Sequence, residues 1–367
     1  MIRLERVTKT YDGVIAVNDI TYDIADGSVC VLIGPSGCGK TTTLRMINRL
    51  VEPTSGDILI DGKSVRTLKS EELRRSIGYA IQNVGLFPHM TVEENVGVVP
   101  GLLHWNKRRI ARRCEELLSL VGLAYGVTAH KYPHQLSGGE AQRVGVARAL
   151  AADPPILLMD EPFGAVDPLT RQRLQTQFIR IQQKLKKTVV FVTHDLDEAI
   201  RLGDRIAIME SGQLVQYDTP ETILSQPATK FVRDFVGTDR ALKRLSRMAV
   251  SKFLKPAVSI PVDSGSAEAL VGKGRYQWFW VVDERQRLVG WANRGDLERS
   301  ISVREAAHLA SATEIALDVD ATLREALSRM LGLGFKYVPV VNEDGTLLGE
   351  LAMGDIESAT LERDERV

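Results

Sequence analysis

The stretch that decides the fold reads Ser28-Val-Cys-Val-Leu-Ile33, then Gly34-Pro35-Ser36-Gly37-Cys38-Gly39-Lys40-Thr41-Thr42, and continues as a helix-like segment to Leu50. A strand, a glycine-rich turn and a helix start, in that order, are the context that a phosphate-binding loop requires. The glycines let backbone N–H groups turn inward around a β-phosphate, and the helix N-terminus favours an anion. We expect Lys40 to reach the β- and γ-phosphates and the Thr41 hydroxyl to ligate Mg²⁺. The alternative, a glycine-rich turn with an incidental lysine, is disfavoured by this context.

Other short aliphatic runs resemble the run that precedes the phosphate loop. They are apolar at nearly every position, which indicates strands buried on both faces of a mostly parallel sheet covered by helices. Longer amphipathic stretches separate them, so the sequence predicts an α/β domain that extends to about Gly237. The runs are 77–81, 156–159, 188–193 and 205–209.

Two carboxylates, Asp160 and Glu161, end the apolar run 156–159. Ligands of parallel α/β sheets bind at the carboxyl ends of the strands, so we expect Asp160 to hold Mg²⁺ through water. Glu161 is the better candidate for polarising an attacking water, because a base must lie within hydrogen-bond reach of the proton that it accepts. An acidic pair after a strand is more often a helix cap or a solvent-facing turn. The phosphate loop upstream reverses that preference.

The segment Leu136-Ser137-Gly138-Gly139-Glu140 precedes the helix-like stretch AQRVGVARALAA. Serine followed three residues later by glutamate is the pattern of a helix capping box, and we expect that role here. Two adjacent glycines nevertheless weaken a first helical turn, which indicates that something must approach this backbone closely. An anion such as a γ-phosphate would suit these N–H groups and the Ser137 hydroxyl.

Beyond Gly237 the composition changes. Residues 240–255 (RALKRLSRMAVSKFLK) are basic and helix-prone and end at Pro256, which predicts a linker helix within 238–255. The simpler interpretation of its charges is a solvated helical face. A Lys/Arg-rich helix near an anionic membrane surface would also be held there electrostatically and released as salt shortens the Debye length.

The C-terminal part of the chain contains an internal repeat. The matching residues of the two halves align in one register with a single two-residue insertion. This predicts duplication of a small βαββ-type unit, over residues 256–311 and 312–367. Each unit alone is near the size at which burial is marginal, so we expect the two to pack together. The matches are Glu268-Ala-Leu270 with Glu325-Ala-Leu327, Val281-Val-Asp283 with Val340-Val-Asn342, Gly290 with Gly349, and Asp296 with Asp355.

Charge and composition limit the kinds of partner. Lysine plus arginine equals aspartate plus glutamate at 47 each, so bulk charge gives no support for nucleic-acid binding. Cys30, Cys38 and Cys114 show neither a pairing nor a metal-binding pattern, which suits a reducing, cytoplasmic compartment. No uninterrupted apolar run approaches the roughly 20 residues that span a bilayer, so we expect any membrane association to come through a partner.

The order of the motifs resembles the ATPase domain of ABC transporters over residues 1–237. The phosphate loop is followed by Gln82 after a strand, LSGGE, the acidic strand end and His194 after the next strand. In that family the LSGGE segment of one subunit closes on the ATP that the phosphate loop of the other subunit holds. The resemblance therefore implies an ATPase that uses ATP and Mg²⁺ and pairs with a second copy of itself.

The resemblance also implies roles for single residues. Tyr11 matches the aromatic residue that stacks on adenine, and Gln82 matches the residue that senses both Mg²⁺ and the membrane subunit. Asp167 matches the aspartate that communicates across the dimer, and His194 the histidine that contacts the γ-phosphate. Without the resemblance, Tyr11 would be read as a core residue and Gln82 and His194 as structural ends of strands. The implied catalytic residues are Glu161, His194 and Lys40.

The sequence between the motifs resembles that of the ATPase subunits of bacterial osmoprotectant importers, which import glycine betaine, carnitine, choline and proline betaine. The repeated C-terminal unit resembles the tandem CBS module that members of this group carry. The resemblance implies transmembrane permease subunits and, indirectly, a solute-binding protein as partners, at the cytoplasmic face of a bacterial inner membrane. The segments that carry it are Tyr79 to Asn95, Glu161 to Pro168 and Phe231 to Gly237.

The CBS resemblance leaves the role of the module open. CBS pairs often bind adenine nucleotides through an aspartate on the ribose, and Asp296 and Asp355 match that position. The accompanying hydroxyl position is Asn293 in the first unit and Ala352 in the second, which departs from the pattern. A structural, dimerising role is therefore the alternative to sensing.

Two alternatives to the osmoprotectant importer remain. An importer of another small solute, such as an amino acid or an ergothioneine-like betaine, would keep the transporter and change its cargo. A soluble ABC ATPase that acts on DNA or the ribosome usually carries coiled-coil insertions or two fused cassettes, and neither is visible in this sequence.

Overall fold

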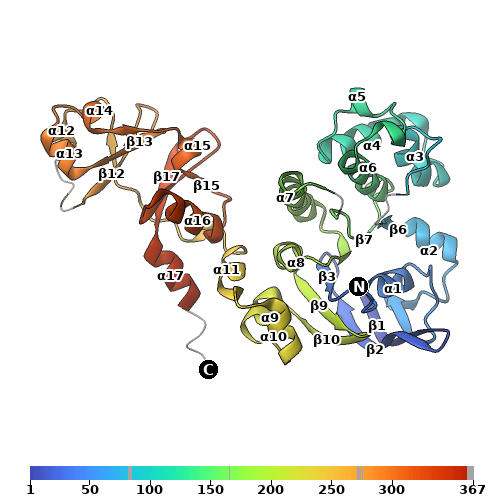
Figure 1. Cartoon of the computed structure of the whole chain (residues 1–367). Helices are drawn as coiled ribbons and strands as arrows, with labels where there is room; N and C mark the ends of the chain where they lie inside the picture. Colours follow the sequence, from blue (N-terminus) through green and yellow to red (C-terminus); the bar gives the residue numbers. More distant parts are fainter. Residues whose placement is uncertain (82–84, 165, 271–273, 275, 362–367) are drawn as a thin grey trace. The chain divides into compact units, whose positions relative to one another are not determined.

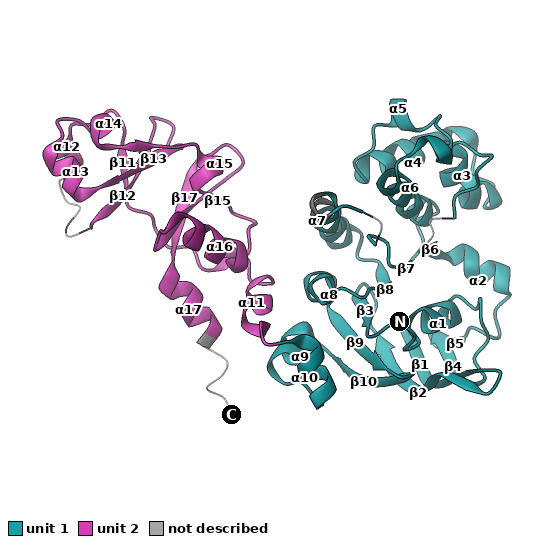
Figure 2. Cartoon of the chain, viewed as in Figure 1, with its two compact units in different colours: residues 1–237 teal, residues 238–367 magenta. Residues whose placement is uncertain are grey.

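The computed structural model describes residues 1–81, 85–164, 166–270, 274 and 276–361 of the chain. Two compact units, Met1–Gly237 and Thr238–Val367, divide it (Figure 2). Figure 1 labels the helices and strands in chain order. Each unit is described by itself below.

The central sheet of the first unit contains, in spatial order, β10 (Gln213–Asp218), β9 (Arg205–Glu210), β3 (Val29–Ile33), β8 (Thr188–Val192), β7 (Ile156–Asp160) and β6 (Ile77–Ala80). All neighbours from β9 to β6 pair in parallel, and β10 pairs antiparallel with β9 at the edge. Every residue of β3, β7 and β8 is buried, as continuous aliphatic runs require. The predicted α/β fold with a mostly parallel sheet is confirmed.

The first unit also contains an antiparallel sheet that the sequence analysis did not predict, with two strands before the phosphate loop and two after it. It contains, in spatial order, β2 (Val14–Ile24), β1 (Ile2–Tyr11), β4 (Ser55–Ile60) and β5 (Lys63–Ser64). At the start of β1, Ile2 and Leu4 are buried whereas Arg3 and Glu5 are exposed. This alternation with a period of two is the sequence signal of a half-buried strand.

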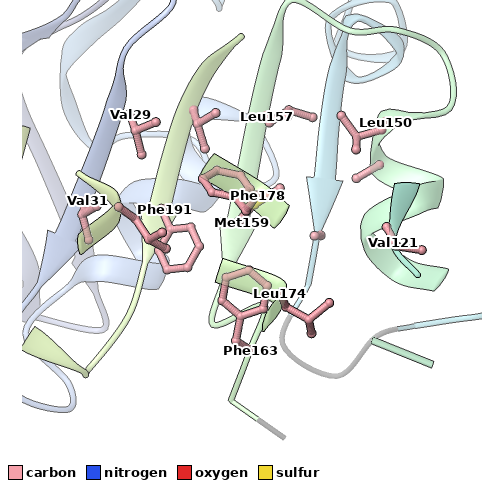
Figure 3. Close-up of a cluster of buried hydrophobic side chains, with 14 of the residues drawn as sticks. Val29, Val31, Val121, Leu150, Leu157, Met159, Phe163, Leu174, Phe178 and Phe191 are labelled. Carbon is pink, nitrogen blue, oxygen red and sulfur yellow. The ribbon is translucent and has the colours of Figure 1, made fainter. Parts of the chain in front are cut away.

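The central sheet separates two hydrophobic cores. Val29 and Val31 of β3 face one core, and Cys30 and Leu32 face the other, which includes the antiparallel sheet and α1 (Lys40–Ile47). The first core is covered by α6 (Gly138–Leu150), α7 (Pro168–Leu185) and α8 (Leu196–Leu202). In it the rings of Phe163, Phe178 and Phe191 lie 5.8–6.5 Å apart between centroids (Figure 3). Burial of each such side chain stabilises the fold by about 1.5–3 kcal/mol.

A helical segment is inserted between β6 and β7. It contains α3 (Val92–Leu102), α4 (Lys107–Leu120) and α5 (Tyr125–Thr128), and α3 and α4 both contact α6 (Figure 1). Within the described residues, no helix has the length and apolarity needed to cross a membrane. The remaining helices of this unit are α2 (Ser70–Ser76), α9 (Pro220–Ser225) and α10 (Lys230–Val236).

The second unit contains two copies of one three-strand arrangement. In the first copy β11 (Ser259–Pro261) pairs in parallel with β12 (Trp278–Val282), which pairs antiparallel with β13 (Leu288–Asn293). In the second copy β15 (Leu317–Asp318), β16 (Tyr337–Val341) and β17 (Leu347–Ala352) pair in the same way. The helices are α12 (Ser266–Leu270), α13 (Arg294–Arg299), α14 (Val303–Ala306) and α15 (Ala312–Ile315), then α16 (Leu323–Leu333) and α17 (Met353–Leu361).

The matching glycines of the repeat have the same role in both copies. Val281 lies opposite Gly290 and Val340 lies opposite Gly349, so the register repeats as well. A Cβ at Gly290 would lie 2.4 Å from the carbonyl oxygen of His308, and one at Gly349 would lie 2.6 Å from that of Lys255. Each glycine therefore admits a close backbone neighbour: β14 (His308–Leu309) beside β13, and the bridge from residue 255 beside β17.

The segment 238–255 differs from the predicted linker helix. It contains a short helix, α11 (Arg240–Leu245), and a separate 3-10 turn, Val250–Lys252. Leu245 and Val250 are buried in the core of the second repeat, and the N–H of Val250 donates to the Ala321 carbonyl at 2.8 Å. Packing of these two apolar residues explains why the segment is not one continuous helix.

Candidate functional site

The phosphate loop joins β3 to α1, and its glycines have positive φ. The φ angles are 152° at Gly34, 81° at Gly37 and 102° at Gly39. A Cβ at Gly34 would lie 2.1 Å from the Met209 carbonyl oxygen, and one at Gly39 would lie 2.5 Å from that of Ala16. Nothing lies within 4 Å of a Cβ at Gly37, so its backbone conformation alone favours glycine there. Pro35, Ser36 and Cys38 complete the loop, and Thr42 lies in the first turn of α1.

Lys40 turns back into the loop from the first position of α1. Its side chain is 7% exposed, and its Nζ donates to the carbonyl oxygens of Gly34 at 2.7 Å and Pro35 at 2.9 Å. A buried ammonium needs such partners, and the loop itself supplies them. The positive charge is thereby held inside the phosphate loop, where an anion would bind.

Thr41 and Asp160 meet between α1 and the end of β7. The Thr41 hydroxyl donates to Oδ1 of Asp160 at 3.0 Å, and Asp160 is 2% exposed. Burial raises the pKa of Asp160, while the Thr41 hydrogen bond and the charge of Arg45 oppose this rise. Mg²⁺ in phosphate-transfer sites usually takes one or two protein oxygens together with phosphates and water. This hydroxyl and carboxylate fit that requirement.

Glu161 and His194 are in contact at the same edge of the sheet. Nδ1 of His194 lies 3.3 Å from Oε1 of Glu161, because the parallel neighbours β7 and β8 end side by side. Glu161 has a φ of 47°, and its N–H donates to the Val192 carbonyl at 2.9 Å. A left-handed conformation is uncommon for glutamate, and such backbone strain clusters at functional sites.

Gln142 on α6 is a residue that the sequence analysis missed. It is 5% exposed, and its Nε2 lies 3.4 Å from the backbone oxygen of Glu161. It therefore connects the LSGGE helix with the acidic strand end. The sequence could have indicated this residue by its spacing. Gln142 is polar, yet it lies three positions before Gly145 and seven before Ala149, on the buried face of the helix.

The segment from Ser137 to Glu140 forms the expected capping box. Ser137 Oγ accepts from the Glu140 N–H at 3.2 Å, and Oε2 of Glu140 accepts from the Ser137 N–H at 2.8 Å. The Ser137 N–H and the Ser137 hydroxyl both donate to the Glu140 carboxylate, and these two hydrogen bonds lower its pKa. A Cβ at Gly138 would meet nothing within 4 Å, and one at Gly139 would meet only Val166 at 3.9 Å. The described part of the chain therefore leaves open space over Gly138, and a Cβ at Gly139 would make only an ordinary van der Waals contact.

The other predicted site residues lie in the first unit. Tyr11 ends β1, is 43% exposed, and has Lys9 Nζ 4.7 Å from its ring centroid, so it is not a core residue. Asp167 caps α7, with its Oδ1 accepting from the Thr170 N–H at 3.0 Å. Gln82 lies outside the described residues.

The aspartates of the second unit already have partners within that unit. Oδ1 of Asp296 accepts from Arg299 at 3.0 Å, and its Oδ2 lies 3.5 Å from Nε2 of His308. Asp355 pairs with Lys255 and accepts from the Ala352 N–H at 3.0 Å. A ribose would have to replace these contacts.

Comparisons with known proteins identify the families of both units. The sequence profile of the ABC transporter family matches residues 17–164, and that of the CBS domain matches residues 305–362. The osmoprotectant import ATP-binding protein OsmV of Salmonella typhimurium is 44% identical over 361 residues, which are 96% of this chain and 94% of that protein. The choline transport ATP-binding protein OpuBA of Bacillus subtilis is 46% identical over 360 residues, 95% of this chain and 93% of that protein.

Solved structures agree with the sequence relatives. The dimeric structure of MJ0796, a bacterial ABC transporter cassette, is 36% identical, with a TM-score of 0.56, and covers 60% of this chain and 98% of that chain. The phosphate loop, the LSGGE helix and the acidic strand end thus lie in a fold shared with this cassette, and the relatives extend through the repeated unit. The chain belongs to the family of ABC transporter ATP-binding proteins of osmoprotectant importers that carry a C-terminal CBS module.

Proposed function

We propose that this chain is the ATP-hydrolysing subunit of an ABC importer for quaternary-amine osmoprotectants of the glycine betaine, carnitine and choline type. The observation that carries the cargo class is the similarity to osmoprotectant and choline import ATP-binding proteins over nearly the whole length, CBS module included. The partners are transmembrane permease subunits and, through them, a solute-binding protein. The chain associates peripherally with the cytoplasmic face of the inner membrane through the permease.

Two copies sandwich two ATP molecules, with the phosphate loop of each facing LSGGE of the other. The space over Gly138 and Gly139 supports this arrangement, because no described residue of the chain would clash with a Cβ at either position. The exposed Tyr11 supports a role in stacking on adenine. The solved cassette with the same fold is itself a dimer.

The site residues have complementary roles in hydrolysis. Lys40 neutralises charge on the β- and γ-phosphates, and Thr41 and Asp160 hold Mg²⁺, directly and through water, with Gln82 as a further ligand. Bound Mg²⁺ supplies additional charge neutralisation of the transferred phosphoryl group. Glu161 orients and polarises the attacking water, and His194 contacts the γ-phosphate while its Nδ1 steadies Glu161. Asp167, which caps α7, transmits closure across the dimer.

Contact of the segment 240–255 with anionic lipid is a finer part of this proposal. Lys243 and Lys255 are paired with Asp239 and Asp355 within the second unit, so the contact would use other basic residues such as the exposed Lys252. Such a contact weakens as salt shortens the Debye length. Transport that is independent of internal salt in liposomes with anionic lipid would exclude it.

The cargo assignment is tested in the assembled transporter. ATP hydrolysis is measured in liposomes with permease and with binding protein loaded with glycine betaine, choline, ergothioneine or an amino acid. We expect stimulation by the quaternary amines glycine betaine and choline. An ATPase that responds only to ergothioneine or only to the amino acid would leave the ATPase assignment standing and overturn the cargo.

The shared ATP site is tested by Gly138→Arg in a Glu161→Gln background. The substitution fits within the chain because the glycine borders open space, but it would block the opposing nucleotide. We expect the chain to bind ATP as a monomer while ATP-induced dimers disappear in size-exclusion chromatography. Unchanged dimers would show that LSGGE does not face the partner's ATP.

A further inference from the structure

A pocket lined by aromatic rings lies between the two repeats of the second unit. Its volume is about 330 Å³, within the range of small-ligand pockets. The first repeat contributes Trp278, Trp280 and Trp291, and the second contributes Phe335 and Tyr337, with Lys336 beside them. The roles assigned above to the ATPase unit and to Asp296 and Asp355 involve none of these residues.

The strand pattern explains how the rings converge. In β12, Phe279 and Val281 face the core of the first repeat, so the alternate residues Trp278 and Trp280 lie on the other face, toward the second repeat. Trp291 lies directly opposite Trp280 on β13. The three tryptophans thus gather as a consequence of the sheet, whereas Phe335 and Lys336 come from the short connection between α16 and β16.

The rings form a corner. The centroids of Trp278 and Trp291 are 4.9 Å apart, and those of Trp291 and Phe335 are 5.4 Å apart with planes inclined by 77°. Trp278 is 49% exposed and Tyr337 is 44% exposed, whereas Trp280 at the base is 6% exposed. Large aromatic faces left half in water at a concave site favour an occupant that covers them.

Charged groups lie on two sides of the corner. Nε1 of Trp280 donates to Oε2 of Glu350 at 2.7 Å, which places a carboxylate at the edge of the basal ring. Lys336 lines the pocket on the second repeat. An occupant with a cationic head would meet ring faces, and an anionic group on the same molecule would find the ammonium of Lys336.

We infer that this pocket binds a small zwitterion that carries a quaternary ammonium and a carboxylate. Aromatic faces attract alkylated ammonium ions through the ring quadrupole, and such ions cannot donate hydrogen bonds, so rings rather than carbonyls suit them. The biological meaning rests on the proposed function: the importer delivers this class of molecule to the compartment of the CBS module. Contacts of this kind with the rings imply a millimolar Kd, which suits a solute that accumulates as an osmoprotectant.

Binding is measured on the full-length chain by intrinsic tryptophan fluorescence. Three of the 4 tryptophans line the pocket, and Trp105→Phe removes the other, so the signal then reports only this site. We expect a saturable change with glycine betaine and with tetramethylammonium. The uncharged-headgroup isostere 3,3-dimethylbutanoate, which has carbon in place of nitrogen, should bind at least about tenfold more weakly.

Variants locate the site. Trp278→Ala and Phe335→Ala should each weaken glycine betaine about tenfold, and Lys336→Ala should weaken glycine betaine but not tetramethylammonium. Ile301→Ala removes an apolar side chain of the same unit that is 89% exposed and does not line the pocket, so it should change nothing. Thermal melts of each variant show whether the unit remains folded.

Several outcomes would overturn the inference. They are the absence of saturable binding, equal affinity for the isostere, displacement of glycine betaine by an adenine nucleotide that binds more tightly, and a fluorescence change that follows protein concentration through self-association. Cargo transport is judged separately in liposomes. If betaine drives ATP hydrolysis there but never binds this pocket, only the present inference fails.

Discussion

Removal of the Glu161 carboxylate tests whether Glu161 and His194 act as a unit. Glu161→Gln keeps the shape of the side chain and removes its basicity, and His194→Ala removes the imidazole whose Nδ1 lies 3.3 Å from the carboxylate. A general base contributes about 10²–10⁴-fold to a rate. A hydrogen bond to a charged group contributes about 1.5–3 kcal/mol, or roughly 10–100-fold.

The contact predicts that these two effects are not fully multiplicative, because His194 acts partly through Glu161 and only its contact with the γ-phosphate is independent. The Glu161 side chain is 20% exposed, so its contact with the histidine is largely shielded from solvent. If the histidine acts by holding the glutamate, the double variant should be about as slow as Glu161→Gln alone; independent roles would multiply to roughly 10³–10⁶-fold. His194 itself is 65% exposed, so its loss should leave the unfolding free energy nearly unchanged.

The assay is ATP turnover of the assembled transporter, with ATP binding and ATP-induced dimerisation measured alongside. We expect Glu161→Gln to bind ATP and to form a stable dimer while turning over very slowly. Wild-type turnover in that variant would show that the base lies elsewhere. Multiplicative losses in the double variant would refute the proposed unit.

Further predictions concern the metal contact, the repeat and a buried carboxyl. Thr41→Ala should raise the Mg²⁺ concentration that half-saturates ATP hydrolysis about tenfold, whereas Thr41→Ser keeps the hydroxyl next to Asp160 and should not. Gly349→Ala places a Cβ 2.6 Å from the Lys255 carbonyl and should destabilise the second unit by about 1–3 kcal/mol in thermal melts, while Gly354→Ala, with nothing within 4 Å, should be neutral or stabilising. Burial raises the pKa of Glu198 above the ordinary 4.5, so the folded state holds its proton more tightly than the unfolded state and stability falls as pH rises from 4.5 through the raised pKa. Glu198→Gln should therefore flatten this fall in the thermal midpoint, and equal slopes for both proteins would contradict the assignment.

The strands of the central sheet were predictable because their signal is continuous. The runs 29–33 and 189–192 are apolar throughout, and a strand of this kind is stable only where both of its faces are buried. The antiparallel sheet gives a weaker signal, since the alternation at Ile2 and Leu4 breaks down where β1 bends at register shifts after residue 4. The segment 240–255 was misread as one helix because charge obscured the two apolar residues, Leu245 and Val250, that dock into the module.

The candidate site was predictable where a residue type has a fixed chemical task. Lys40, Thr41 and Asp160 converge because a phosphate loop and a strand end share one edge of a parallel sheet. The contact between Glu161 and His194 depends on the order β8-β7 in space, which the sequence alone does not give. Gln142 was missed because its task is to support a backbone atom, and the sequence does not show which backbone atom lies nearby.

The open glycines after Ser137 have a consequence for cells that contain mixed copies. If each ATP needs surfaces from two molecules, a chain with a defective LSGGE segment prevents hydrolysis of the ATP that its wild-type partner holds. Such a chain would act as a dominant negative when it is produced together with the wild-type chain. It would still bind ATP at its own phosphate loop, so an assay of nucleotide binding would not detect the defect. Dilution of the isolated cassettes would also lower their activity, because the fraction of active dimer falls as the two copies dissociate.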